Sequence, residues 1–177
     1  MRVYIVRHGE TMVNASNKLQ GRINSGLTEE GLKQCVELRK KFEDKKIDLI
    51  VSSPLDRCKQ TAEILSNGKI PVVYTEALLG RDHGEFTGMH RDSINFEEYW
   101  NYYLNKKYEK AENIQDLYNR AKDVLLDLKK DYDDSDIIVV THSGIIRVLY
   151  YYFNGIPEDG NLGEVYIDNC SVYEYEI

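Results

Sequence analysis

Three polar clusters hold the residues of this sequence that could do chemistry. They are Arg7-His8-Gly9, then Ser52-Ser53-Pro54 leading to Arg57, and finally Thr141-His142-Ser143-Gly144. Together they offer two imidazoles and two guanidiniums, with glycines that let a ligand approach the backbone. Guanidinium binds phosphate oxygens in a planar, bidentate manner, and a neutral histidine is a competent nucleophile toward phosphorus. The clusters therefore favour phosphoryl chemistry that needs no metal ion and no other cofactor.

Each cluster follows directly on a segment with the composition of a β-strand. Arg2 to Val6, Asp48 to Ser52 and Asp136 to Thr141 are short, and the last contains the apolar run Ile137-Ile138-Val139-Val140. A continuous apolar run suits a strand that is buried on both faces. Ligands of open α/β sheets bind outside the carboxyl ends of the strands. We therefore expect the three clusters to meet in one pocket.

The segments between these strands have the apolar spacing of helices. One helix begins after Thr28 as N-cap, a second opens at Pro54, and Glu112 to Lys130 and Gly144 to Phe153 supply two more. Pro71 to Tyr74 predicts a further strand. Alternation of this kind builds a parallel sheet with helices on both faces.

The last residues predict one or two closing strands, Val165 to Ile167 and Ser171 to Tyr175. The sequence has no internal repeat and no linker, and 177 residues match one domain. We therefore expect residues 1–177 to form a single α/β domain, a three-layer sandwich with a mostly parallel central sheet.

Composition excludes several classes of partner. The 23 Lys and Arg residues against 30 Asp and Glu give a net charge of −7, which repels nucleic acid. No apolar stretch approaches the length of a membrane span, and Val3 to Val6 is too short for a signal-peptide core. Three scattered cysteines do not make a disulfide framework. These features predict a cytoplasmic protein that binds neither nucleic acid nor membrane.

The pentapeptide Arg7-His8-Gly9-Glu10-Thr11 resembles the signature of the histidine phosphatase superfamily, also called phosphoglycerate-mutase-like. The resemblance covers essentially the whole chain. In family order and near family spacing come Asn14, Gln20-Gly21, Leu27-Thr28 with Gly31, Ser52-Ser53-Pro54 with Arg57, Thr61 and Ala62, Gly84 and Gly88, and His142-Ser143-Gly144 with Arg147. It implies the phosphoglycerate-mutase-like fold and a phosphatase or mutase that acts on a small phosphorylated metabolite, such as a phosphosugar or α-ribazole phosphate.

The resemblance also implies a role for each matching residue. His8 is then the phosphorylated histidine, and Arg7, Arg57 and His142 are ligands of the transferring phosphoryl group, assisted by Asn14. His8 must attack unprotonated, so its other ring nitrogen should donate to a backbone carbonyl. A cationic His142 would add charge stabilisation.

One position departs from the family pattern. The family usually carries a glutamate, the proton donor to the leaving oxygen, four residues before the glycine that here is Gly84. This sequence has Gly80 there. Asp82 is our first candidate for the missing donor and Glu85 is the second.

The length favours a phosphatase over a mutase, because mutases of this family are generally longer and enclose the intermediate. Two alternatives stay open. Gly80 at the position of the acid motivates a non-catalytic module that binds a phospholigand, and a phosphoglycerate mutase is the other.

The remaining polar and aromatic residues receive plainer interpretations. His83 and His90 lack the spacing of metal ligands, so we take them as loop or surface histidines and expect no metal site. Cys58 lies on the apolar side of its helix and is expected in the core. The aromatic residues from Phe96 to Tyr108 either pack against the edge of the sheet or form a lid over the pocket.

Overall fold

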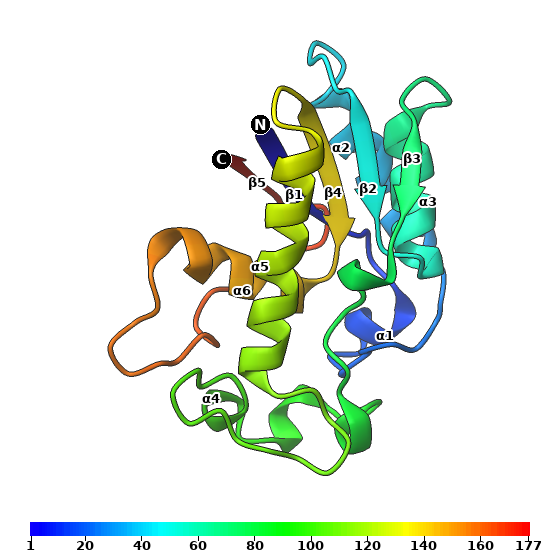
Figure 1. The fold of residues 1–177 in the computed structure, drawn as a ribbon. Coiled ribbons are helices and arrows are strands. Elements are labelled where there is room, and N and C mark those ends of the chain that lie inside the picture. Colours follow the sequence, from blue (N-terminus) through cyan, green and yellow to red (C-terminus); the bar gives the residue numbers. More distant parts are fainter.

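A five-stranded sheet forms the layer between the helices in the upper half of the molecule (Figure 1). The computed structural model describes residues 1–177. The strands are β1 (Arg2–Arg7), β2 (Leu49–Ser52), β3 (Val72–Tyr74), β4 (Asp136–Thr141) and β5 (Val172–Glu176). Their order is β3-β2-β4-β1-β5, and every neighbouring pair is parallel except β1 with β5. The mostly parallel sheet predicted from the sequence is confirmed.

Helices cover both faces of this sheet (Figure 1). The α-helices are α1 (Met12–Ala15), α2 (Glu29–Lys40), α3 (Asp56–Ser66), α4 (Phe96–Tyr99), α5 (Ile114–Asp131) and α6 (Ser143–Asn154), and the 3₁₀ turns are η1 (Glu76–Leu78), η2 (Gly84–Phe86) and η3 (Arg91–Ser93). Helices α2 and α3 pack on one face, and α5 and α6 pack on the other. The three-layer sandwich is therefore confirmed. None of these helices is both long and apolar enough to cross a lipid bilayer.

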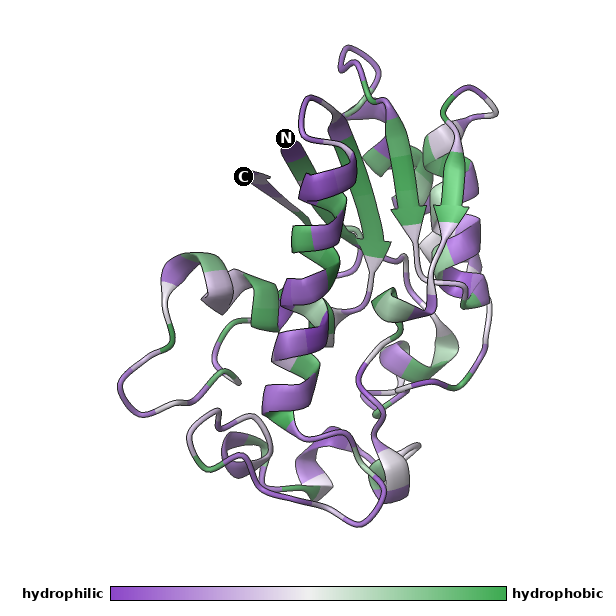
Figure 2. Cartoon of the chain, viewed as in Figure 1, coloured by the Kyte–Doolittle hydropathy of each residue, from purple (hydrophilic) through white to green (hydrophobic).

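The alternation of side chains along each strand divides the core into two parts. Val3 and Ile5 of β1 join the cluster packed under α5 and α6, whereas Tyr4 and Val6 join the cluster packed under α2 and α3. Both sets are buried. The strands β2 and β4 are also buried along almost their whole length, and both are mainly hydrophobic in Figure 2. Cys58 lies fully buried in the second cluster, as expected.

Helix α2 begins where its capping residue predicts, whereas α3 begins at Asp56, two residues after the predicted start at Pro54, with no side-chain cap. The hydroxyl of Thr28 accepts a hydrogen bond from the amide of Gly31 and starts α2, with Glu29 and Glu30 in the first turn. Helix α5 starts later than expected, because the side chain of Asn113 accepts from the amide of Asp116 and fixes the first turn there.

The predicted strand at Val165 to Ile167 is wrong. These residues form no ladder, and β5 is the only closing strand. Their carbonyl groups are occupied by arginines instead: Arg147 Nη2 donates to Val165 O, and Arg7 Nη1 donates to Ile167 O. The backbone of this segment is thus committed to side chains of the neighbouring site.

Strand register aligns the ends of the three central strands. Arg7 lies opposite Thr141, and Ser52 lies opposite Val140. The residues that leave β1, β2 and β4 therefore emerge together at one edge of the sheet.

Candidate active site

The three predicted clusters meet at this edge. His8 directly follows β1, Arg57 lies in the first turn of α3 after β2, and His142 is the N-cap of α6 after β4. These three side chains and Arg7 line one cavity. The three clusters therefore meet in a single pocket, as the sequence predicts.

His8 is fixed in one tautomer. Its Nδ1 is 2.7 Å from the carbonyl oxygen of Gly9, to which it donates, and its Nε2 accepts from Arg57 Nε at 3.3 Å. The ring is buried, and burial together with the charges of Arg7 and Arg57 lowers the pKa of His8 well below its usual value. Nε2 is therefore unprotonated, as a nucleophile requires.

Gly9 allows this arrangement by its lack of a side chain. A Cβ at this position would lie 2.6 Å from the carbonyl oxygen of Gly31 and 2.8 Å from the Sγ of Cys35. Only glycine lets the loop after β1 pack this closely on α2.

Arg57 connects the two histidines. Besides His8, its Nη1 donates to Ile23 O at 2.7 Å, and its Nη2 donates to Gly21 O at 2.8 Å and to His142 Nδ1 at 3.0 Å. Burial lowers the pKa of Arg57 to about 10, so the guanidinium stays charged at neutral pH. It is held in place by backbone carbonyls rather than by a carboxylate, so its charge remains available to an anion.

His142 is neutral in this arrangement. A guanidinium can only donate, so Nδ1 of His142 accepts from Arg57 and its Nε2 donates to Ser53 Oγ at 2.8 Å. Burial, followed by the charge of Arg57, lowers the pKa of His142 well below its usual value. The cationic His142 expected from the sequence is thus not what the protein favours. Its ring centroid lies 5.2 Å from that of His8.

Arg7 and Asn14 complete the wall nearest His8. Arg7 donates to Ile167 O, and its buried Nε has no partner in the protein. Asn14 lines the cavity and donates to Gln20 Oε1 at 3.2 Å, while its Oδ1 accepts from the Thr11 amide at 2.8 Å. Both side chains are oriented before any ligand binds.

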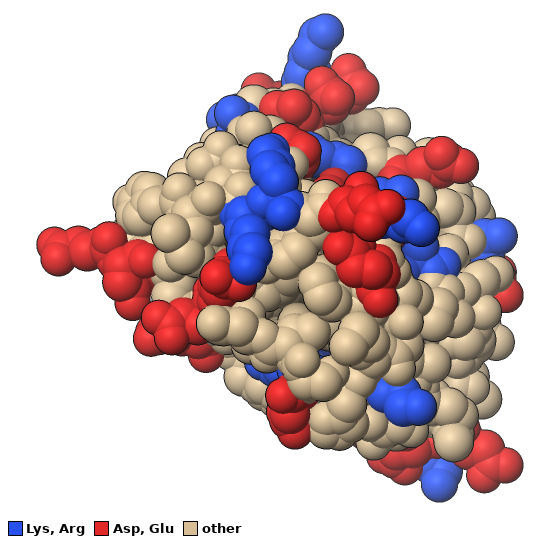
Figure 3. Space-filling model, turned by 90° about the horizontal axis from the view of Figure 1, so that it is seen from below, with Lys and Arg blue, Asp and Glu red and all other residues tan.

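The lining of the cavity is strongly cationic. No Asp or Glu lines it, and no arginine of the lining lies within ion-pair distance of a carboxylate. The cationic residues of the lining are Arg7, Lys18, Arg57, Arg81, Arg91 and Arg147. The outer surface differs, because Figure 3 shows acidic and basic side chains interspersed over the lower face of the molecule. No group of three or more His, Cys, Asp or Glu side chains is close enough to hold a metal ion. The cavity is therefore built for an anion.

The whole chain matches a known family. A family model described as the histidine phosphatase superfamily (branch 1) matches residues 3–177. The chain belongs to the histidine phosphatase superfamily. The uncharacterized phosphatase PhoE of Bacillus subtilis is 32% identical to this histidine phosphatase over 154 residues, which cover 86% of this chain and 77% of the relative.

Two further proteins place this histidine phosphatase within the superfamily. Phosphoserine phosphatase 1 of Hydrogenobacter thermophilus is 27% identical over 185 residues, covering 100% of this chain and 85% of the relative. The phosphoserine phosphatase of Entamoeba histolytica, solved in complex with 3-phosphoglyceric acid, superposes with a TM-score of 0.87 at 24% identity, covering 98% of this chain and 89% of that one. Family and relatives identify the present chain as a phosphoric monoester hydrolase.

The structure does not bring Asp82 or Glu85 into the cavity of this histidine phosphatase. Asp82 Oδ1 accepts from the Gly84 amide at 2.9 Å, and its Oδ2 lies 3.5 Å from Arg22 Nη1. Both carboxylate oxygens of Glu85 accept from the backbone amides of residues 109 and 110. Neither residue is part of the lining. The geometry thus speaks against both as proton donors, because each carboxylate is engaged in holding the loop.

Gly80 does lie at the cavity. A Cβ built there would be 3.2 Å from Cγ of His142 and 3.4 Å from the carbonyl oxygen of Gly21. An acidic side chain at this position would start beside His142, so its absence leaves the centre of the cavity without a carboxylate.

Sequence reasoning missed several residues of the lining. Arg81, Arg91 and His83 come from the irregular segment between β3 and α5, whose path no periodicity predicts. His83 lies in a loop, as expected, but it is only 9% exposed and lines the cavity, whereas His90 is exposed. The signal that could have found His83 was its place three residues after Gly80, in the loop where an acid was missing.

The aromatic residues from Phe96 to Tyr108 were predicted either to pack against the edge of the sheet or to form a lid over the pocket, and they share features of both. Tyr99 and Trp100 are buried in the core cluster under α5 and α6. Phe96 and Trp100 also line the cavity, so this cluster packs against the sheet and forms one apolar wall of the site.

Proposed function

We propose that this protein hydrolyses phosphomonoesters of small metabolites through a phosphohistidine on His8, without a metal ion. The observation that carries the proposal is the unprotonated Nε2 of His8, which faces Arg57 in a cavity without carboxylates. The nucleophile and the arginine charges that would neutralise the phosphoryl oxygens are thus already in place before the ester binds.

The reaction has two steps. The phosphoryl group of the ester lies among Arg7, Arg57 and His142, and Nε2 of His8 attacks phosphorus while the bond to the leaving oxygen breaks. The leaving oxygen takes up a proton as it departs. Water then attacks the phosphorus and gives up a proton, the P–N bond breaks, and its electrons return to His8. The Nδ1 hydrogen bond to Gly9 stabilises the positive charge that His8 develops when Nε2 bonds to phosphorus.

A panel of phosphate esters with a chelator present tests this function. We expect phosphate release that survives chelation, is abolished in His8→Ala, and proceeds through an acid-labile phosphoenzyme. Binding of phosphate or vanadate without turnover above that of His8→Ala would instead indicate a module that only binds. Interconversion of phosphoglycerates faster than phosphate release would indicate a mutase, and loss of activity with the chelator would contradict the metal-free site.

The charge of the cavity supports a more specific substrate class, an ester with a second anionic group. A phosphate dianion at His8 engages Arg7 and Arg57, which leaves the guanidiniums of Arg81, Arg91 and Arg147 without an anionic partner. Buried atoms of two of them, Arg81 Nη2 and Arg147 Nε, have no partner at all. Unpaired buried charge is costly, so a carboxylate or second phosphate on the substrate would find a prepared site. Relatives named phosphoserine phosphatase act on such an ester by name.

Two substrates that differ by one carboxylate test this class. Arg91 stacks on Phe96 at 3.9 Å, and Arg91→Met keeps an apolar side chain against the ring while removing the charge. We expect the variant to raise KM for 3-phosphoglycerate by about tenfold, which corresponds to about 1.4 kcal/mol, with little change for glycerol 3-phosphate. Arg39→Met, at a half-buried position of α2 outside the cavity lining, is the matched control. Equal effects on both substrates would contradict a second anion site.

A further inference from the structure

Hydrolysis of an alkyl phosphate through His8 requires a proton for the leaving oxygen, and the carboxylate that could supply it is missing from the cavity. The lining contains no Asp or Glu. Apart from cationic arginines and a lysine, its titratable side chains are His8, His142, His83 and Tyr166. His8 and His142 already hold the phosphoryl group, and Tyr166 is 67% exposed. His83 is the remaining buried group.

We propose that His83 is the proton-transferring residue of this enzyme, the general acid for the leaving oxygen and then the general base for water. The inference rests on the phosphohistidine route proposed above. No Asp or Glu of the chain is placed to take this role, and His83 has the position, orientation and open nitrogen that it requires.

The position of His83 is set by the loop that carries it. Gly84 has a φ of +48°, and a Cβ there would lie 2.4 Å from the Ala111 amide nitrogen, so only glycine lets the loop pack on the segment before α5. The carbonyl of His83 accepts from the Phe86 amide at 2.8 Å, and that of Asp82 accepts from Glu112 at 2.9 Å. The backbone on both sides of His83 is therefore held.

The ring of His83 lies across the backbone of Gly21 from Arg57. A Cβ built on Gly21 would be 3.1 Å from Cδ2 of His83, while the carbonyl of Gly21 accepts from Arg57. The imidazole therefore lies beside the residues that would hold the phosphoryl group, Arg7, Arg57 and His142, and makes no hydrogen bond to His8. A proton donor must lie there, beside the leaving group and apart from the nucleophile.

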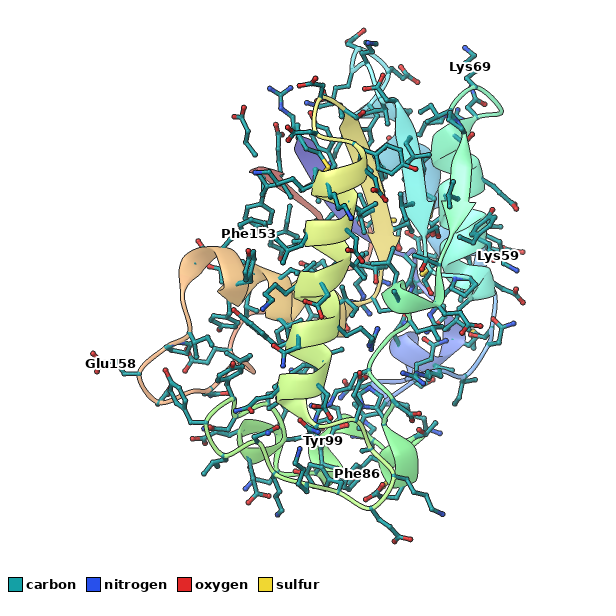
Figure 4. All side chains as sticks on the ribbon, viewed as in Figure 1. Lys59, Lys69, Phe86, Tyr99, Phe153 and Glu158 are labelled. Atoms are coloured by element: carbon teal, nitrogen blue, oxygen red, sulfur yellow. The ribbon has the colours of Figure 1, made fainter.

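Only one nitrogen of His83 has a partner in the protein. Nδ1 is 2.8 Å from the hydroxyl of Tyr99, which lies with Phe86 below the start of α5 (Figure 4). Nε2 makes no hydrogen bond within the protein and is not fully enclosed, and His83 lines the cavity. The Tyr99 hydroxyl can donate to neutral imidazole and accept from imidazolium. It therefore keeps the ring orientation in both protonation states.

The proton balance follows from these contacts. When the ester binds, its negative charge favours the imidazolium, whose proton comes from the ester monoanion or from solvent. The P–O bond breaks, and the proton on Nε2 passes to the leaving oxygen. In the second step water attacks the phosphohistidine, and its proton returns to Nε2. Without a ligand, burial and the charge of Arg81 lower the pKa of His83 to about 3, so the ring is neutral until an anion arrives.

Leaving-group dependence distinguishes proton transfer from a structural role. We would measure the single-turnover rate of His8 phosphorylation in His83→Asn with 4-nitrophenyl phosphate, whose leaving group needs no proton, and with glycerol 2-phosphate, whose leaving group does. The expected loss is about a hundred- to ten-thousand-fold with glycerol 2-phosphate and little with 4-nitrophenyl phosphate. With the aryl ester the phosphoenzyme should accumulate after a burst, because water activation is also slowed.

Controls keep the two proposals separate. His90→Asn, the same change at an exposed histidine, should behave as wild type, and Tyr99→Phe should give a smaller loss with the same dependence on leaving group. Equal slowing with both esters, or slowing with neither, would overturn the role of His83 while the phosphoenzyme on His8 still forms. If wild-type protein forms no phosphoenzyme on His8, the proposed function itself fails. Should His83→Asn not fold, Tyr99→Phe supplies the same comparison.

Discussion

Arg57 donates through Nε to Nε2 of His8 over 3.3 Å, so the nitrogen proposed as nucleophile points directly at a guanidinium. The same side chain also reaches His142 and two backbone carbonyls. One arginine therefore sets the geometry between the two imidazoles, and in the proposed reaction the same guanidinium supplies charge to the oxygens of the ester.

Replacement of Arg57 by lysine should retain the charge and lose this geometry. A single ammonium cannot reproduce four directed contacts, so we expect Arg57→Lys to slow phosphorylation of His8 by about a hundred- to a thousand-fold, the usual cost of one oxyanion donor. Rapid-quench measurement of the phosphoenzyme checks this. Arg39→Lys, at a half-buried position of α2 outside the cavity lining, should keep the wild-type rate. A wild-type rate in Arg57→Lys would show that charge alone is sufficient.

Three buried histidines should make stability depend on pH. Burial lowers the pKa of His8, His83 and His142, whereas in the unfolded chain each has a pKa of about 6.5. Below that pH the unfolded chain binds protons that the folded protein does not, so the free energy of unfolding falls as pH falls. Each histidine contributes about 1.4 kcal/mol per pH unit, and for His83 the loss continues toward its folded pKa of about 3.

Denaturant unfolding between about pH 6 and pH 5 checks this slope. His142→Asn should reduce it by up to about 1.4 kcal/mol per pH unit. Equal slopes in wild type and His142→Asn would mean that His142 titrates alike in both states.

The central part of the site was predictable because it depends on sheet topology. Each of His8, Arg57 and His142 follows a strand within a few residues. In a parallel sheet the strand ends share one edge, so local sequence was enough to bring these residues together. The buried strands and the helices were predictable too, because apolar spacing and capping residues are local features of the sequence.

The outer part of the site was not predictable, since it depends on irregular backbone. Arg81 is placed by donating to the carbonyls of Tyr99 and Glu112, and such contacts leave no periodic signal. The segment from Val165 to Ile167 shows the converse. It alternates like a strand, yet arginines of the site take its carbonyl groups. In both segments the backbone conformation is set by tertiary contacts and not by local sequence periodicity.

The two carboxylates of the loop after Gly80 should be dispensable for chemistry. Asp82 and Glu85 accept hydrogen bonds from backbone amides outside the cavity. We therefore expect Asp82→Asn and Glu85→Gln to turn over glycerol 2-phosphate at close to the wild-type kcat, with at most a small loss of stability. A large fall in kcat with the alkyl ester alone would restore one of them as the proton donor and remove the need for His83.

Ser53 should matter to catalysis through His142. Its hydroxyl accepts from Nε2 of His142 at 2.8 Å, so the ring presents Nδ1 to Arg57. Ser53→Ala leaves a buried N–H without this partner, and we expect it to cost about 1–3 kcal/mol of stability and to lower the rate of His8 phosphorylation, because His142 loses its fixed orientation. Ser52→Ala is the matched control, since the Ser52 hydroxyl is equally buried but donates to the Ser53 carbonyl. That variant should lose stability without slowing phosphorylation, whereas equal rates in the two variants would mean that the orientation of His142 does not depend on Ser53.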